Sequence, residues 1–140
     1  MKKMILITTS NEVSVIDYPV EKPGDYMAEL RGFYKAINCD CVREVHARYM
    51  SQFIDDCKGL VMIVDEEGLI AGKQMNMVGS LFYGTALHSN PIVGDILIMS
   101  EEIGFGPELA GLEEERAEKI AEKVRKIIEA YYIGEACTDE

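Results

Sequence analysis

The stretch from Leu60 to Ser100 constrains the fold more than any other part of the chain. It contains two apolar runs, residues 60–64 and 92–99, which are separated by an acidic turn and a short segment with helical spacing. Apolar runs of this length, rich in β-branched residues, are typical of buried strands. We therefore expect these two segments to lie side by side in a single sheet.

The segment between the two runs carries strong turn and cap signals. Residues 65–68 (DEEG) are expected to turn the chain, with Gly68 at a position that tolerates positive φ and Leu69-Ile70 pairing back as a short second arm. Asn76 is a suitable N-cap for a helix through Tyr83 that Gly84 closes. Gly94 marks a bulge or a close backbone approach.

The N-terminal part of the chain predicts a hairpin, a helix and a further strand. Residues 3–8 and 12–18 flank a Ser-Asn turn signal, as the two arms of a hairpin do. Residues 25–37 place apolar side chains on one helical face between an Asp cap and an Asn terminator. Residues 39–47 follow as a strand.

The C-terminal part predicts one long amphipathic helix. Its apolar stripe runs through residues 113–132, and Gly134 is expected to end it. Residues 104–111 contain Gly and Pro and are expected to form an irregular connection.

Together these patterns predict an α+β fold. We expect a single domain over residues 1–132, with a mostly antiparallel sheet of about five strands and two main helices, 25–37 and 113–132, packed on one face of it. Residues 133–140 are expected to form a frayed acidic tail.

Composition excludes several classes of partner. The formal net charge of −11 disfavours a direct nucleic-acid interface, because such proteins carry a basic surface. No apolar run approaches the roughly 20 residues that a membrane span needs, and no signal peptide is recognisable, so we expect a cytoplasmic protein without membrane contact. The cysteines show no disulfide spacing and are expected to be reduced.

Signatures of metal, cofactor and nucleophile chemistry are missing from the sequence. Cys39, Cys41, His46 and Cys57 lack the two paired groups of a structural zinc site, so no metal site is expected. No Gly-rich phosphate loop, zinc-protease motif or nucleophile elbow occurs, and no cofactor or catalytic residue is predicted.

Polar residues around the central stretch are the candidates for ligand binding. Asp65, Glu66, His88 and Asp95 could converge where one strand ends and another begins. Asn76, Ser80 and Tyr83 have spacings of four and three and share one side of a helix. Each also has a structural interpretation: the acids as turn residues, Asn76 as a cap, Ser80 in packing and Tyr83 half-buried. The candidate ligand-binding residues are therefore Asp65, Glu66, Asn76, Ser80, Tyr83, His88 and Asp95.

The motifs of this stretch resemble a known family. Residues 64–70 (VDEEGLI), Asn76, residues 80–84 (SLFYG) and residues 91–95 (PIVGD) occur in the order seen in a family of small proteins from bacteria, plasmids and phages, a domain of unknown function. The resemblance covers residues 26–100. It implies a small α+β fold and a phage or mobile-element context, and it supplies no catalytic residues.

We therefore expect a non-enzymatic protein that binds a protein or a small molecule, as an inhibitor or ligand sponge acting against host defence. One alternative is a small hydrolytic enzyme that uses the clustered carboxylates. Another is a structural homo-oligomer built on the helix at 113–132, or a nucleic-acid mimic, although lysines and arginines interrupt the acidic face of that helix.

Overall fold

The computed structural model describes residues 1–140 apart from 23, 86–89, 104–106 and 139–140, and it describes only the backbone at 103, 107 and 133–138. The described residues form six strands in one sheet. They are β1 (Lys3–Ile7), β2 (Val13–Asp17), β3 (Val42–Val45), β4 (Leu60–Asp65), β5 (Ile96–Ile103) and β6 (Pro107–Ala110). The helices are α1 (Tyr26–Ile37), the short 3-10 helix η1 (Met50–Gln52), α2 (Met77–Tyr83) and α4 (Glu114–Thr138). This architecture confirms the α+β class.

All pairings in the sheet are antiparallel, and the strand order is β2-β1-β5-β4-β3. β4 and β5 are neighbours with Leu60 opposite Ser100, which confirms that the two apolar runs lie side by side. The expected hairpin of β1 and β2 also forms. β6 folds back on the outer half of β5, with Ser100 opposite Ala110.

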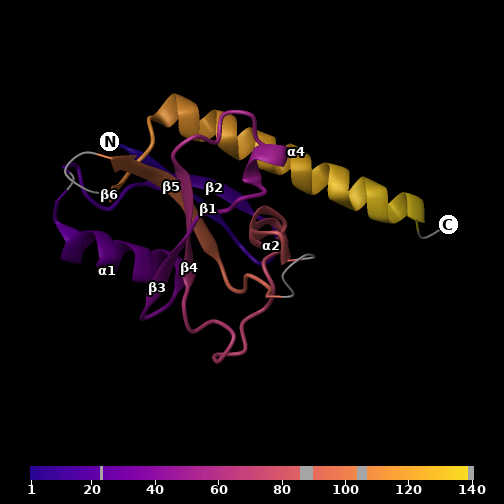
Figure 1. The fold of residues 1–140 in the computed structure, drawn as a ribbon, viewed down its shortest axis with the longest axis horizontal. Helices are drawn as coiled ribbons and strands as arrows, with labels where there is room; N and C mark the ends of the chain where they lie inside the picture. The colour runs from indigo at the N-terminus through magenta and orange to yellow at the C-terminus, as the bar shows by residue number, and fades with distance from the viewer. Residues whose placement is uncertain (23, 86–89, 104–106, 139–140) are drawn as a thin grey trace.

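The two main helices cover opposite faces of the sheet, so their expected placement on one face is wrong. The apolar stripe of α4 packs with Ile5, Met62 and Ile98 in one core, whereas α1 packs with Ile63 and Leu97 in a second core. Figure 1 shows the strands between α1 and α4. In β4 and β5, apolar side chains point toward both faces of the sheet. A strand that is buried on both faces needs a layer of structure over each face, and α1 and α4 supply these layers.

The predicted caps are present at both ends of α1 and α2. Asp25 accepts a hydrogen bond from the Ala28 amide, and Asn76 accepts one from the Gly79 amide. Asn38 ends α1 with φ of 52°, and Gly84 ends α2 with φ of 83°. Short-range signals of this kind need no tertiary information, which is why the sequence predicts them well.

Several boundaries differ from expectation. Leu69 and Ile70 do not form a pairing arm but lie in an exposed turn, and the positive φ there belongs to Gly72 rather than Gly68. β5 begins at Ile96 instead of Ile92, because Gly94 has φ of +79° and interrupts the extended backbone.

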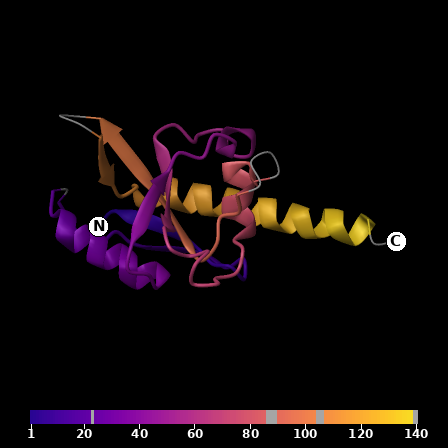
Figure 2. The same ribbon diagram turned by 60° about the horizontal axis from the view of Figure 1, so that its bottom comes forward.

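The C-terminal region also departs from the predicted pattern. The segment expected to be irregular contains β6, which pairs antiparallel with the preceding strand β5. α4 continues past Gly134 to Thr138, and Figure 2 shows its C-terminal end extending beyond the rest of the molecule. Among the described residues, no helix has both the length and the apolar character that crossing a membrane requires.

Candidate functional site

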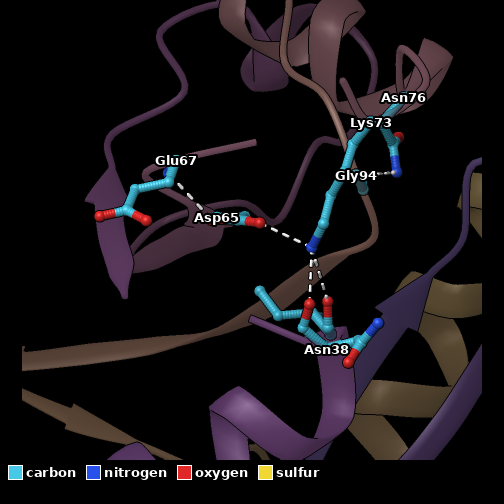
Figure 3. A network of polar contacts seen from close by, with 7 residues as sticks. Asn38, Asp65, Glu67, Lys73, Asn76 and Gly94 are labelled. Carbon is cyan, nitrogen blue, oxygen red and sulfur yellow. Dashed lines mark hydrogen bonds and ion pairs between the residues drawn. The ribbon is translucent and has the colours of Figure 1, made fainter. Parts of the chain in front are cut away.

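Asp65 lies at the end of β4 and is held in a network of internal polar contacts (Figure 3). Its carboxylate pairs with Lys73 Nζ at 2.6 Å and accepts a hydrogen bond from the Glu67 amide at 2.9 Å. Lys73 Nζ also donates to the carbonyls of Asn38, at 2.6 Å, and Ile37, at 3.4 Å. The ammonium of Lys73 lies at the C-terminal end of α1, where a positive charge is favoured. Through Asp65 and Lys73, the end of β4 and the loop that follows it are thus linked to the end of α1.

Asn76 and Ser80 serve as buried supports. The Asn76 amide nitrogen donates to the carbonyls of Ile7 and Gly94, each at 3.0 Å, while its oxygen caps α2. The Ser80 hydroxyl oxygen accepts from the Ile92 amide at 3.0 Å. Asn76 is completely buried, and its amide nitrogen and oxygen both form hydrogen bonds within the protein. The contacts of Asn76 and Ser80 therefore fit a structural role in the fold.

The remaining predicted site residues do not gather around one centre. Glu66 is exposed and accepts a hydrogen bond from the Cys41 thiol at 2.9 Å. Asp95 accepts one from the Thr9 amide at 3.0 Å and lines a hollow of about 160 Å³, whereas Asp65 and Glu66 line a different one of about 50 Å³. Tyr83 is half-buried on α2, and His88 lies outside the described residues.

A larger hollow lies between the N-terminal half of α1 and the sheet, and we call it the α1 hollow. Its volume is about 310 Å³, at the lower end of the range for small-molecule sites. Residues of α1, β3, β4 and β6 and of the loop before α1 line it. Its lining residues are Gly24, Tyr26, Glu29, Leu30, Phe33, Val42, Glu44, Ile63, Glu108 and Leu109.

The α1 hollow combines an apolar floor with carboxylates. Phe33 and Ile63 are buried in the core beneath it, while Glu29, Glu44 and Glu108 are its ionisable lining residues. Glu29 is only 6% exposed, and the Tyr18 hydroxyl donates a hydrogen bond to it. Within the described part of the chain, no lysine, arginine or histidine forms an ion pair with Glu29.

Tyr18 is fixed as a hydrogen-bond donor toward Glu29. Burial of the phenol, reinforced by its hydrogen bond to Glu29, raises the pKa of Tyr18 well above its usual range. The phenol therefore stays protonated at neutral pH, and it supplies a dipole but no positive charge. The negative charge of Glu29 remains without a cationic counterpart among the described residues.

A second group of polar side chains lies on the same face of the sheet. His46 Nε2 lies 3.3 Å from Glu101 Oε1 and 3.6 Å from Glu44 Oε1. Burial, followed by hydrogen bonding and repulsion from Glu101, raises the pKa of Glu44 to about 7, while the hydrogen bond from Glu44 lowers the pKa of Glu101. Part of the rise in the pKa of Glu44 is thus the cost of holding a second carboxylate beside it.

These groups were only partly visible in the sequence. Glu44 and His46 have the two-residue spacing that places both on one face of a strand, but nothing local connects them to Glu101 of β5. Glu29 reads as an ordinary acidic residue in the first turn of a helix. Cys39, Cys41 and Cys57 do not join His46 in any described cluster of potential metal ligands.

Comparison with known proteins yields no relative for this chain: no protein-family model, curated protein or solved structure matches it.

Proposed function

We propose that this protein is a non-enzymatic binding protein that holds a small cationic amphiphile in the α1 hollow. The observation that carries the proposal is the buried Glu29 carboxylate, which lines the α1 hollow and has no ion pair among the described residues. A buried carboxylate is costly unless a charge or several hydrogen bonds compensate for it. A ligand ammonium or guanidinium group would supply that compensation.

The chemistry of the lining selects this class of ligand. A cation 4 Å from one carboxylate gains about 4 kcal/mol at an effective dielectric constant near 20, and Glu44 and Glu108 lie in the same lining. The floor formed by Phe33 and Ile63 favours an apolar body attached to the cation. The same carboxylates disfavour phosphate-bearing ligands, in keeping with the net charge of −11.

The biological role that we propose rests on the family resemblance. In a phage or mobile element, such a protein would act as an inhibitor or ligand sponge against host defence. Its addition to a host that carries a defence system should then restore phage growth. Failure to do so across several defence systems would count against this role and leave the binding proposal intact.

The binding proposal is tested with three probes of equal shape. Isothermal titration calorimetry of the purified protein with phenethylamine, 2-phenylethanol and phenylacetate compares a cation, a neutral molecule and an anion. We expect phenethylamine to bind about tenfold more tightly than 2-phenylethanol, or about 1.4 kcal/mol, and phenylacetate not to bind.

The matched variants are Glu29→Gln and Glu67→Gln. Glutamine keeps the acceptor that Tyr18 requires but removes the charge, so Glu29→Gln should abolish the preference for the amine. Glu67 is exposed on the loop after β4, and its substitution should change nothing. Equal binding of the amine and the alcohol, or a preference that survives in Glu29→Gln, would overturn the proposal.

A further inference from the structure

Glu44, His46 and Glu101 bring three potential metal-ligand atoms together on the α1 face of the sheet. Glu44 belongs to β3, His46 follows it by two residues, and Glu101 reaches toward them from β5, on the far side of β4. All three ligand atoms lie within 4.8 Å of one another. Two strands that are not neighbours thus converge on one point above the sheet.

The spacing of these atoms fits the coordination shell of a small divalent ion. Nitrogen and oxygen ligands of zinc lie about 2.0 to 2.2 Å from the ion, which places neighbouring ligands of a tetrahedron about 3.3 to 3.6 Å apart. The observed distances from His46 Nε2 are 3.3 Å to Glu101 and 3.6 Å to Glu44. The third edge, between the two carboxylates, is no longer than 4.8 Å.

The charge balance of the cluster also favours a cation. Among the described residues, neither Glu44 nor Glu101 forms an ion pair with a lysine or arginine, so His46 is the basic group that faces both. Two carboxylates at this separation repel each other when both are ionised. A divalent ion would neutralise both and leave the imidazole as a neutral ligand.

The surroundings provide access for an ion. The His46 side chain is 67% exposed, which gives the cluster an open path from solvent. Glu44 also lines the α1 hollow, so the cluster borders that hollow. Three protein ligands with one open position form the usual arrangement of an accessible zinc site.

We propose that Glu44, His46 and Glu101 form a three-ligand site for a divalent first-row transition metal, with zinc as the best match to one imidazole and two carboxylates. The site shares Glu44 with the α1 hollow, but its other two ligands, His46 and Glu101, do not line that hollow. Variants at His46, Glu101 and Glu29 therefore test the metal site and the amine site separately.

The experiment uses zinc chloride and cobalt chloride with the full chain. After treatment with a chelator and its removal, calorimetric titration at neutral pH should show one zinc ion per chain. Cobalt should give the visible absorption of a tetrahedral or five-coordinate ion without the intense sulfur-to-metal band that thiolate ligands produce. Absence of binding at zinc concentrations up to about 100 µM, well above the dissociation constants of structural zinc sites, would overturn the proposal.

Variants separate this site from the cysteines and from the α1 hollow. His46→Gln and Glu101→Gln should each weaken zinc binding about tenfold or more, whereas Glu102→Gln, on the opposite face of β5, should bind as the parent protein does. Glu29→Gln should lose the amine preference and keep the metal. Zinc binding unchanged in His46→Gln and Glu101→Gln, or a cobalt spectrum dominated by the sulfur band, would place the metal elsewhere and refute the site.

Discussion

At the scale of single residues, the same polar side chain can serve the fold or a ligand, and its contacts decide between the two. Asn76 and Ser80 have the helical spacing of a polar binding face, yet both are buried and bonded to nearby backbone groups. Glu29 has no motif around it, yet it opens onto the α1 hollow. Asn76 and Ser80 are neutral groups whose hydrogen bonds satisfy them, whereas the one hydrogen bond from Tyr18 leaves the charge of Glu29 without a cation among the described residues.

Cys41 gives a residue-level prediction about reactivity. The hydrogen bond to Glu66, with further contributions from burial and the carboxylate charge, raises the pKa of the Cys41 thiol to about 11. Because the thiolate is the reactive form, Cys41 should be alkylated slowly at pH 8. Glu66→Gln removes the neighbouring negative charge and should lower the pKa of the Cys41 thiol. A larger fraction of Cys41 is then thiolate at pH 8, and this gain exceeds the accompanying loss in nucleophilicity of the thiolate. Alkylation should therefore become about tenfold faster.

The rate is measured by mass spectrometry of the Cys41 peptide after timed exposure to iodoacetamide. Glu12→Gln, a substitution at an exposed glutamate of the β1–β2 hairpin, is the control and should leave the rate unchanged. A rate at Cys41 that does not respond to Glu66→Gln would show that Glu66 does not set the pKa of this thiol.

At the scale of elements, local signals were predictable and long-range ones were not. The caps Asp25 and Asn76 follow from side chains that bond to the next turn of the same helix. Lys73 could not be found in this way, because its ammonium reaches the end of α1 from a different part of the chain. β6 pairs with the preceding strand β5, but the Gly and Pro residues at 104–107 favour an irregular connection there.

Lys73 carries the element-level prediction. Lys73→Met keeps the approximate length of the side chain but removes its charge. The Asp65 carboxylate, which is 5% exposed, then has no cation beside it. The substitution also removes two hydrogen bonds to carbonyls at the end of α1. We expect a loss of about 2 kcal/mol in the free energy of unfolding, because Lys73 is partly exposed and the cost lies below that of a fully buried pair. Urea unfolding at pH 7 measures it.

Two further variants identify the cause. Adding Asp65→Asn to Lys73→Met removes the uncompensated charge and should recover part of the lost stability, as coupled residues do in a double-mutant cycle. Lys58→Met, at an exposed position, should cost less than about 0.5 kcal/mol. If Lys73→Met is no more destabilising than Lys58→Met, the contacts in Figure 3 do not stabilise the fold.

At the scale of the whole molecule, the arrangement of layers depends on information that periodicity does not contain. The spacing in α1 and α4 shows that each has one apolar face, but not which side of the sheet each one covers. The stripe of α4 is buried against its own sheet through Ala117, Val124 and Ile128. Homo-oligomer formation through this helix therefore stays a prediction, and it would have to use other residues of α4.

The net charge of −11 leads to a prediction about salt. Folding brings an excess of carboxylates close together, and their repulsion opposes the compact state. Exposed ion pairs such as Lys119–Glu115 act in the opposite sense but contribute at most about 1 kcal/mol each. Salt should act mainly on this repulsion. At 0.1 M salt, exposed charges more than about 10 Å apart are largely screened from each other, and the many like-charge pairs at such distances outnumber the short ion pairs. Raising sodium chloride from about 20 mM to 500 mM should therefore increase the free energy of unfolding by about 1 kcal/mol.

The control for this prediction reverses charge on the exposed side of α4. Glu118→Lys with Glu129→Lys changes the net charge by four, from −11 to −7, at two positions without a buried side chain. The variant should be more stable than the parent at 20 mM salt and should respond less to added salt, because fewer carboxylates repel one another. Chloride is the appropriate anion, since sulfate strengthens apolar burial through its exclusion from the protein surface. A parent protein that loses stability as sodium chloride is added would mean that its ion pairs outweigh its excess negative charge.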